Sequence, residues 1–177
     1  GRDAEEGLVA CVVAQDGKSA SLVKVSSETD FAGKSPAFVN FVMHVADATL
    51  TADSDSMLEP QSVLALESDS KSVQTALEEA IVAIRENLGV SSAMKLTTGD
   101  HGMLVAYVHG KAADGSNAGS AAAIVEISGE GVDPETMRTA GKKLAMHIVA
   151  AKPLYLDPES VPSDVIEKEK EILKSQV

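Results

Sequence analysis

Val23-Lys24-Val25-Ser26-Ser27-Glu28-Thr29-Asp30-Phe31-Ala32-Gly33-Lys34-Ser35-Pro36 is the stretch that decides the fold, because a strand ends and a helix begins within it. Alternating apolar residues up to Val25 are typical of a half-buried strand. Ser35 is a favourable N-cap and Pro36 suits the first helical position, which predicts a helix from Pro36 to about Leu50. The connection places Phe31, one of only five aromatic residues, beside a carboxylate on a loop. An aromatic side chain in that position is a candidate anchor for a partner.

Upstream of this stretch the sequence indicates a β-hairpin. Two strand-like runs, Leu8–Val13 and Ala20–Val25, are separated by a short polar segment. Its Asp16-Gly17 pair tolerates the positive φ of a tight turn. The first half of the chain therefore opens with two antiparallel strands.

Downstream of the first helix, residues 51–70 are rich in Asp and Ser and are broken by Pro60. This composition predicts a surface excursion with at most a short helical turn. A second amphipathic helix is predicted from Lys71 to about Asn87, with Gly89 placed to end it. A weak strand, Ala93–Thr97, then leads to a turn near residue 100.

The second half repeats the order of the first. Two strand-like runs, Met103–Val108 and Ala121–Ile127, precede a helix that begins at Asp133-Pro134 and must finish before Pro153. The glycine-rich segment 110–119 between the strands lacks the Lys-Ser/Thr ending of a phosphate loop and is interpreted as a long hairpin loop. Small residues on one face of the helix, Ala140, Gly141 and Ala145, allow a close approach to a sheet.

These patterns predict an α+β fold of two small subdomains, each an antiparallel hairpin-based sheet packed with helices. The N-terminal core subdomain is expected to span residues 1–100. The C-terminal core subdomain is expected to span residues 101–177 and to end in a charged helix over Pro162–Val177, in which Glu and Lys alternate around a narrow apolar stripe.

Charge and cysteine content exclude several classes of function. The chain has 15 Lys plus Arg against 27 Asp plus Glu, a net charge of −12, which disfavours direct binding to nucleic acid or to an anionic membrane. No apolar run approaches the length of a membrane span and the first residues lack signal character, so a soluble protein is expected. The single cysteine, Cys11, lies in an apolar run and is interpreted as a buried structural thiol.

No motif for covalent chemistry, a cofactor or a metal is visible. The four histidines, His44, His101, His109 and His147, are scattered without zinc-ligand spacing. No pair of carboxylates can be assigned as general acid and base. The expectation is a protein that is not an enzyme and that carries neither a cofactor nor a metal ion.

Five segments, in order, resemble elongation factor Ts, the family of nucleotide exchange factors for elongation factor Tu. The first is Val23–Lys34, which is similar to the family's strand and Thr-Asp-Phe-Val-Ala loop, although Ala32 stands in place of Val and Gly33 in place of Ala. The other segments are Glu6–Val9, Ile84–Leu88, Tyr107–Gly110 and Leu144–Pro153, the last continued by Val161–Glu169. The resemblance covers nearly the whole chain and implies the elongation factor Ts core fold.

The resemblance also implies a partner-binding site. In the family the Asp-Phe pair, here Asp30 and Phe31, is inserted between helices of the nucleotide-binding domain of elongation factor Tu. By the same resemblance, partner contacts are expected from Thr29, Ala32, Ile84, Arg85, His109 and Gly110. Plainer interpretations stay open beside these: Phe31 packing back on its own helix, Asp30 as a turn residue, Ile84 in the core beside a solvated Arg85, and His109 as a surface histidine.

The function implied is a translation elongation factor that promotes GDP release from elongation factor Tu, in a bacterial cytoplasm, a mitochondrial matrix or a chloroplast stroma. The alternative is a structural or docking module of the same fold within a larger assembly, without exchange activity. The family's small helical domain before the core, and its final strand after the helix at Pro162, are not expected within these 177 residues.

Overall fold

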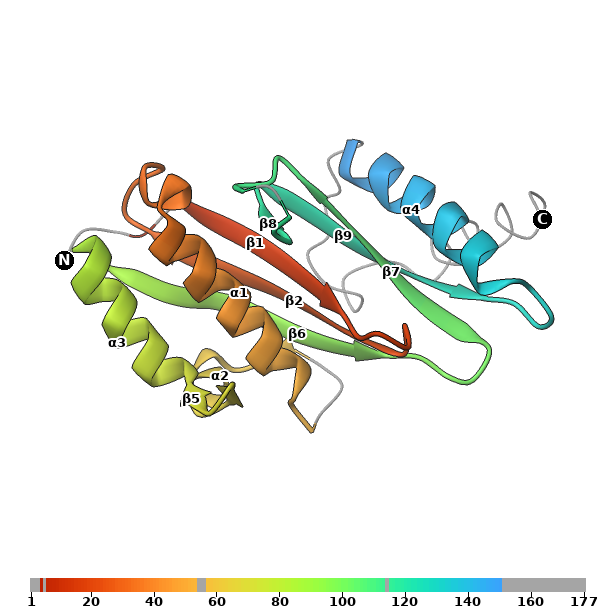
Figure 1. Ribbon diagram of the computed structural model, residues 1–177, viewed down its shortest axis with the longest axis horizontal. Helices are drawn as coiled ribbons and strands as arrows, with labels where there is room; N and C mark the ends of the chain where they lie inside the picture. The colour runs from red at the N-terminus through yellow and green to blue at the C-terminus, as the bar shows by residue number, and fades with distance from the viewer. Residues whose placement is uncertain (1–3, 5, 54–56, 114, 151–177) are drawn as a thin grey trace.

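The computed structural model describes residues 4, 6–53, 57–113 and 115–150, and it has the α+β architecture that the sequence predicts. Its larger sheet has five strands (Figure 1). Their spatial order is β3 (Met57–Leu58), β6 (Leu88–Thr97), β2 (Ser19–Ser27), β1 (Glu6–Val13) and β8 (Ala118–Gly119). The predicted tail helix lies outside the described residues.

The predicted N-terminal hairpin is confirmed as β1 and β2, which pair antiparallel from Glu6↔Ser27 to Val13↔Ala20. Gly17 adopts φ 73 in the connecting turn, as expected for the Asp-Gly pair. Both strands extend two residues beyond the predicted hairpin at the open end. Ser27, the last residue of β2, therefore stands directly before the Glu28–Phe31 loop.

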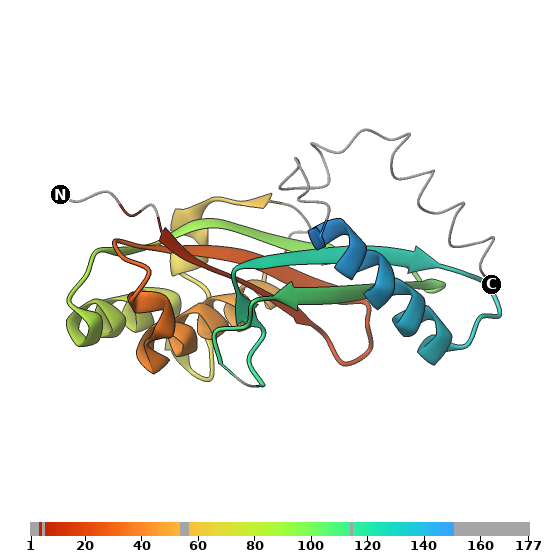
Figure 2. The ribbon, with the colours of Figure 1, turned by 90° about the horizontal axis from the view of Figure 1, so that it is seen from above.

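One face of the large sheet is covered by helices (Figure 2). After the short 3-10 helix η1 (Ala32–Lys34), α1 runs over Pro36–Leu50, the bounds predicted from Ser35 and Pro36. Phe38 is the largest fully buried side chain and lies between α1 and the sheet in the first core cluster. Burying a Phe side chain stabilises the fold by about 1.5–3 kcal/mol, so this contact fixes α1 on the sheet.

The excursion over residues 51–70 has the short helix expected of it and, in addition, two short strands that the sequence did not predict. It contains β3, the helix α2 (Pro60–Leu64) and the strand β4 (Glu67–Ser68), which pairs with β5 (Lys71–Ser72). Val63 of α2 is fully buried against the first core cluster. Leu58, Leu64 and Leu66 also pack on this cluster, so the excursion is anchored by several apolar side chains.

The predicted bounds of the second helix are wrong at both ends. Helix α3 spans Val73–Ile84, because Ser72 caps it by accepting a hydrogen bond from the Thr75 N–H. Its C-cap is Arg85 in the left-handed conformation, at φ 62 and ψ 34, and not Gly89. Gly89 instead belongs to β6, which begins five residues earlier than the predicted strand and pairs with the whole of β2.

The second half contains the predicted hairpin and helix, β7 (Gly102–His109), β9 (Ala121–Ser128) and α4 (Pro134–Ala150). Helix α4 covers one face of the hairpin (Figures 1 and 2). The close approach expected at Gly141 is confirmed, since a Cβ there would lie 2.5 Å from Ile127 Cδ1 and 2.7 Å from Val105 Cγ2. Val105 and Ile127 belong to the second core cluster, so the absence of a side chain at Gly141 lets α4 pack directly on that cluster.

The glycine-rich segment between β7 and β9 is more than a hairpin loop. Its strand β8 leaves the hairpin and pairs with β1 of the large sheet, through Val9↔Gly119 and Ala10↔Ala118. The Cys11 N–H extends this pairing by donating to the Asn117 carbonyl at 3.2 Å. The two halves are therefore joined through the sheet edge, while the division of the chain at residue 100 stays a prediction.

Candidate functional site

Phe31 stands at the tip of the loop between β2 and α1, and its side chain is 74% exposed. Its carbonyl accepts the Lys34 N–H at 3.1 Å, so the residue opens the short helix η1. The next residue, Ala32, is only 3% exposed and belongs to the first core cluster. The backbone thus turns Ala32 inward and leaves Phe31 projecting into solvent, which is the opposite of packing back on its own helix.

The base of this loop is held by a reciprocal pair of hydrogen-bonded carboxylates. Glu28 Oε1 accepts the Asn87 N–H at 2.7 Å, while Glu86 Oε2 accepts the Thr29 N–H at 3.3 Å. The Thr29 hydroxyl also donates to Glu86 Oε1. We call these four residues the loop clamp. Hydrogen bonds to charged groups are stronger than neutral ones, so the clamp fixes the loop to the segment that follows α3.

The loop clamp was missed by reasoning from the sequence, which selected Thr29 and Arg85 but not Glu28, Glu86 or Asn87. A signal was present, since both segments occur among the family-like motifs and each carries a Glu followed by a polar residue. Glu28 and Asn87 lie 59 residues apart in the chain, so only the pairing of β2 with β6 makes the contact visible.

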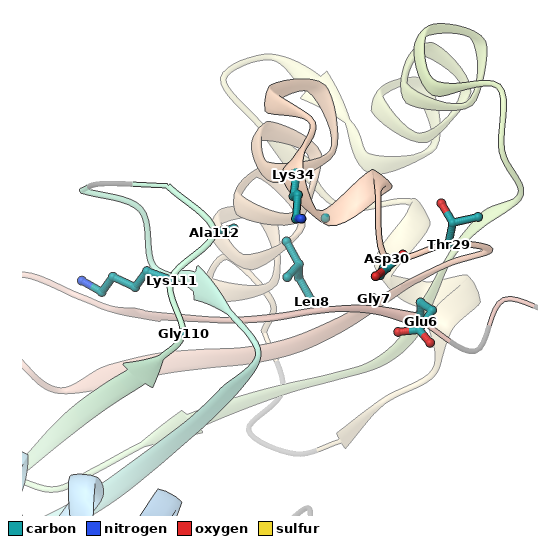
Figure 3. Close-up of a pocket in the computed structure, with 10 residues that line it drawn as sticks. Glu6, Gly7, Leu8, Thr29, Asp30, Lys34, Gly110, Lys111 and Ala112 are labelled. Atoms are coloured by element: carbon teal, nitrogen blue, oxygen red, sulfur yellow. The ribbon is translucent and has the colours of Figure 1, made fainter.

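Beside the loop is a surface hollow of about 350 Å³ between the start of β1, the loop and the segment after β7. Thr29, Asp30 and Gly110 line it together, although they come from opposite halves of the chain. Figure 3 shows the carboxylates of Asp30 and Glu6 on the same side of this hollow, with Lys111 extending away from it. The structure therefore brings three of the predicted site residues to one place.

The remaining predicted residues surround this place without lining the hollow. Ile84 is half-buried and packs on the first core cluster, and Arg85 is exposed where α3 turns toward the loop clamp. His109 is exposed at the end of β7, where its Nδ1 lies 3.3 Å from the Tyr107 hydroxyl. Ala32 differs from them, because it supports the loop from inside the core and does not face solvent.

The described part of the chain has no group of three or more His, Cys, Asp or Glu side chains placed to hold a metal ion. Cys11 is buried as predicted, and desolvation by burial raises the pKa of its thiol to about 12. The reactive thiolate is thus suppressed at neutral pH. No helix among the described residues is long and apolar enough to cross a membrane.

Replacing Glu86 by glutamine tests the loop clamp. An amide keeps one acceptor oxygen but turns an NH₂ group toward the Thr29 donors, so we expect a loss of about 1 kcal/mol and faster hydrogen exchange at the Thr29 amide. Glu78→Gln on α3 is the control, because an amide there still accepts the bond from Gln74. Equal exchange rates in the two variants would show that Glu86 does not hold the loop.

A comparison with known families decides what kind of protein carries this loop. The family model described as "Elongation factor TS" matches residues 28–177. The chain belongs to the elongation factor Ts family. An elongation factor Ts from Trichlorobacter lovleyi is 36% identical over 179 residues, covering 99% of this chain and 55% of that protein. One from Halothermothrix orenii is 34% identical over 177 residues, covering 100% of this chain and 56% of that protein. The chain thus spans about half the length of these relatives.

Gly33 is where the elongation factor Ts loop pattern has Ala, and the structure allows that residue. A Cβ on Gly33 would lie 3.6 Å from Leu8 Cδ2, an ordinary contact, and the φ of Gly33 is not positive. We expect Gly33→Ala to stabilise the protein by about 0.4–1 kcal/mol, because it restricts the unfolded chain. Urea unfolding measures this change, and a destabilised variant would show that the loop needs the freedom of glycine.

Proposed function

We propose that this chain is a translation elongation factor, a guanine nucleotide exchange factor that binds the nucleotide-binding domain of elongation factor Tu and promotes GDP release. The observation that carries the proposal is the exposed Phe31 on a loop fixed by the loop clamp. Phe31 is the aromatic side chain that would enter the partner, and the family membership of the chain supports elongation factor Tu as that partner.

Fixing the loop before binding matters for affinity. A flexible loop would lose conformational freedom when its tip is buried, whereas a loop already held by Glu28 and Glu86 loses less. Asp30 is exposed beside Phe31 and is available to a donor on the partner. Arg85 and His109 lie on segments flanking the loop and the hollow, which supports a contact surface broader than the tip.

The mechanism needs no covalent step, so the protein is proposed not to be an enzyme in the chemical sense. Binding and nucleotide release are linked: a factor that lowers the affinity for GDP must itself bind less tightly when GDP is present. Such coupling is typically about 1–3 kcal/mol, or about 5- to 150-fold in affinity. The buried area of one aromatic side chain is large enough to contribute energy of this size.

The direct test measures GDP release from the cognate elongation factor Tu loaded with a fluorescent GDP analogue. Substoichiometric amounts of the wild-type chain are expected to accelerate release, and the chain is expected to bind nucleotide-free factor more tightly than the GDP form. Tight binding of both forms without faster release would instead favour the docking module, and no binding to either form would overturn the proposed function.

The relatives compared are bacterial, which supports a bacterial cytoplasm as the place of action over a mitochondrial matrix or a chloroplast stroma. The net charge of −12 supports a protein partner over direct contact with nucleic acid. The docking module within a larger assembly stays the alternative to this proposal.

A further inference from the structure

A second and larger hollow lies away from the Phe31 loop, between the edge of β1 and the edge of β7. Its volume is about 510 Å³, which is within the range of binding pockets. One end is closed by a hydrogen bond from the Leu104 N–H to the Gly17 carbonyl, at 2.8 Å. The other is bounded by Asn117, whose carbonyl accepts the Cys11 N–H. We call this space the edge groove.

Both walls of the edge groove are strand edges, and some of their backbone N–H and C=O groups are not paired with a neighbouring strand of the described chain. Alternate residues of a strand direct their N–H and C=O groups to the same side. Val13 lies two residues beyond Cys11, and Ala106 lies two residues beyond Leu104, so their backbone groups are directed into the groove. In the described chain β1 pairs with β8 only at Val9 and Ala10, and β7 pairs only with β9. The groove therefore presents two edges able to accept an extended chain.

The charge of the edge groove is opposite to that of the molecule. Lys111, Arg138 and Lys142 line it, and no Asp or Glu is among its lining residues. The described residues offer these three cations no ion pair or hydrogen bond with a side chain. Arg138 and Lys142 are four residues apart on α4, so both project from the helix face toward the groove. Three cations at one hollow, none with a side-chain partner among the described residues, are unusual in a chain with a net charge of −12.

From these observations we infer that the edge groove binds an acidic peptide segment in the extended conformation. The segment pairs its backbone with Val13 and Ala106, and its carboxylates meet Lys111, Arg138 and Lys142. Addition of a strand to an exposed edge supplies affinity through main-chain hydrogen bonds, and side-chain charge then selects the ligand. This inference is independent of Phe31 and of nucleotide exchange.

The negative net charge of the protein makes it possible to distinguish binding in the edge groove from nonspecific electrostatic attraction to the rest of the surface. A protein with an excess of acidic groups repels an acidic peptide at long range and attracts a basic one. Saturable binding of an acidic peptide is therefore a signature of the groove, and preference for a basic peptide would be the signature of the remaining surface. The Cys11 thiol takes no part, because its raised pKa keeps it protonated.

The test is fluorescence anisotropy of the full chain with a labelled pentapeptide that alternates glutamate and valine. We expect saturable binding, weakened at least about tenfold by the double variant Arg138→Glu, Lys142→Glu, since both rim charges reverse. Lys143→Glu is the matched control: it is exposed on the same helix, about 100° round from Lys142, and does not line the groove. This control is expected to bind within about twofold of wild type.

Backbone pairing is tested with the same peptide methylated at alternate backbone nitrogens, which is expected to bind at least about fivefold more weakly because it loses donors to the strand edge. Any of four results would overturn the inference: no binding of the acidic peptide, tighter binding of a lysine-valine counterpart, equal loss in Lys143→Glu, or unchanged affinity of the methylated peptide. Full displacement of the peptide by millimolar pyrophosphate, with pyrophosphate binding lost in the double variant, would assign the groove to small polyanions instead.

Discussion

Phe31→Ala is expected to lower the second-order rate constant for stimulated GDP release by about 10- to 150-fold, corresponding to the roughly 1.5–3 kcal/mol gained when a Phe side chain is buried. The side chain is 74% exposed in the free protein, so its removal takes almost nothing from the fold. The free energy of unfolding should change by less than about 0.5 kcal/mol. Stopped-flow fluorescence of GDP release, with urea unfolding of the same samples, measures both quantities.

Val82→Ala is the matched control for Phe31→Ala. Val82 is 77% exposed on α3, so it is also a large apolar side chain without a role in the core. It lies two residues before Ile84, about 200° round the helix, and so faces away from the side on which Ile84 packs against the first core cluster. Its removal should leave GDP release unchanged. Equal effects of the two substitutions, or no effect of either, would show that Phe31 is not the inserted side chain.

Local signals were sufficient to predict α1 but not α3. The signals that predict α1, Ser35, Pro36 and the apolar spacing that follows, all lie within one segment, although the Ser35 side chain makes no capping hydrogen bond. The end of α3 depends on Glu86, which turns away to accept the Thr29 N–H from a loop 57 residues earlier in the chain. Arg85 takes a left-handed conformation to allow that turn. Helical periodicity continues past this point in the sequence, so no local pattern marks the end.

Contacts between distant segments also limited what the sequence could predict about the two hollows. Asp30 and Phe31 are predicted site residues because the loop is recognisable in the sequence, and the exposure of Phe31 follows from Ala32 turning inward. The edge groove was not predictable, because it forms only when β8 crosses to β1 and sets β7 beside it. Segment 110–119 is interpreted as a hairpin loop because it is rich in glycine, lies between two predicted strands and lacks the ending of a phosphate loop. Functional residues that lie within one segment can be predicted from the sequence, whereas sites formed by contacts between segments can be predicted only when the sheet topology is known.

Gly7→Ala should cause the largest loss of stability. Gly7 adopts φ +155, and a Cβ there would lie 2.1 Å from the Val25 carbonyl oxygen, within the backbone of the neighbouring strand. No side-chain rotation relieves that contact, so β1 must shift relative to β2. Backbone strain and overpacking of this kind together cost about 3 kcal/mol. Urea unfolding should show a lower midpoint with an unchanged slope.

The chain supplies an internal control for Gly7 in the same row of the sheet. Gly7 and Gly89 pair with Ser26 from its two sides, but a Cβ on Gly89 would meet no atom within 4 Å. Gly89→Ala should therefore be neutral or slightly stabilising. Since Ser26 is two residues from Glu28, a shift of β1 also disturbs the base of the loop clamp, and Gly7→Ala should slow stimulated GDP release while Gly89→Ala leaves it intact. A Gly7→Ala protein as stable as Gly89→Ala would contradict the strand pairing on which the position of Phe31 depends.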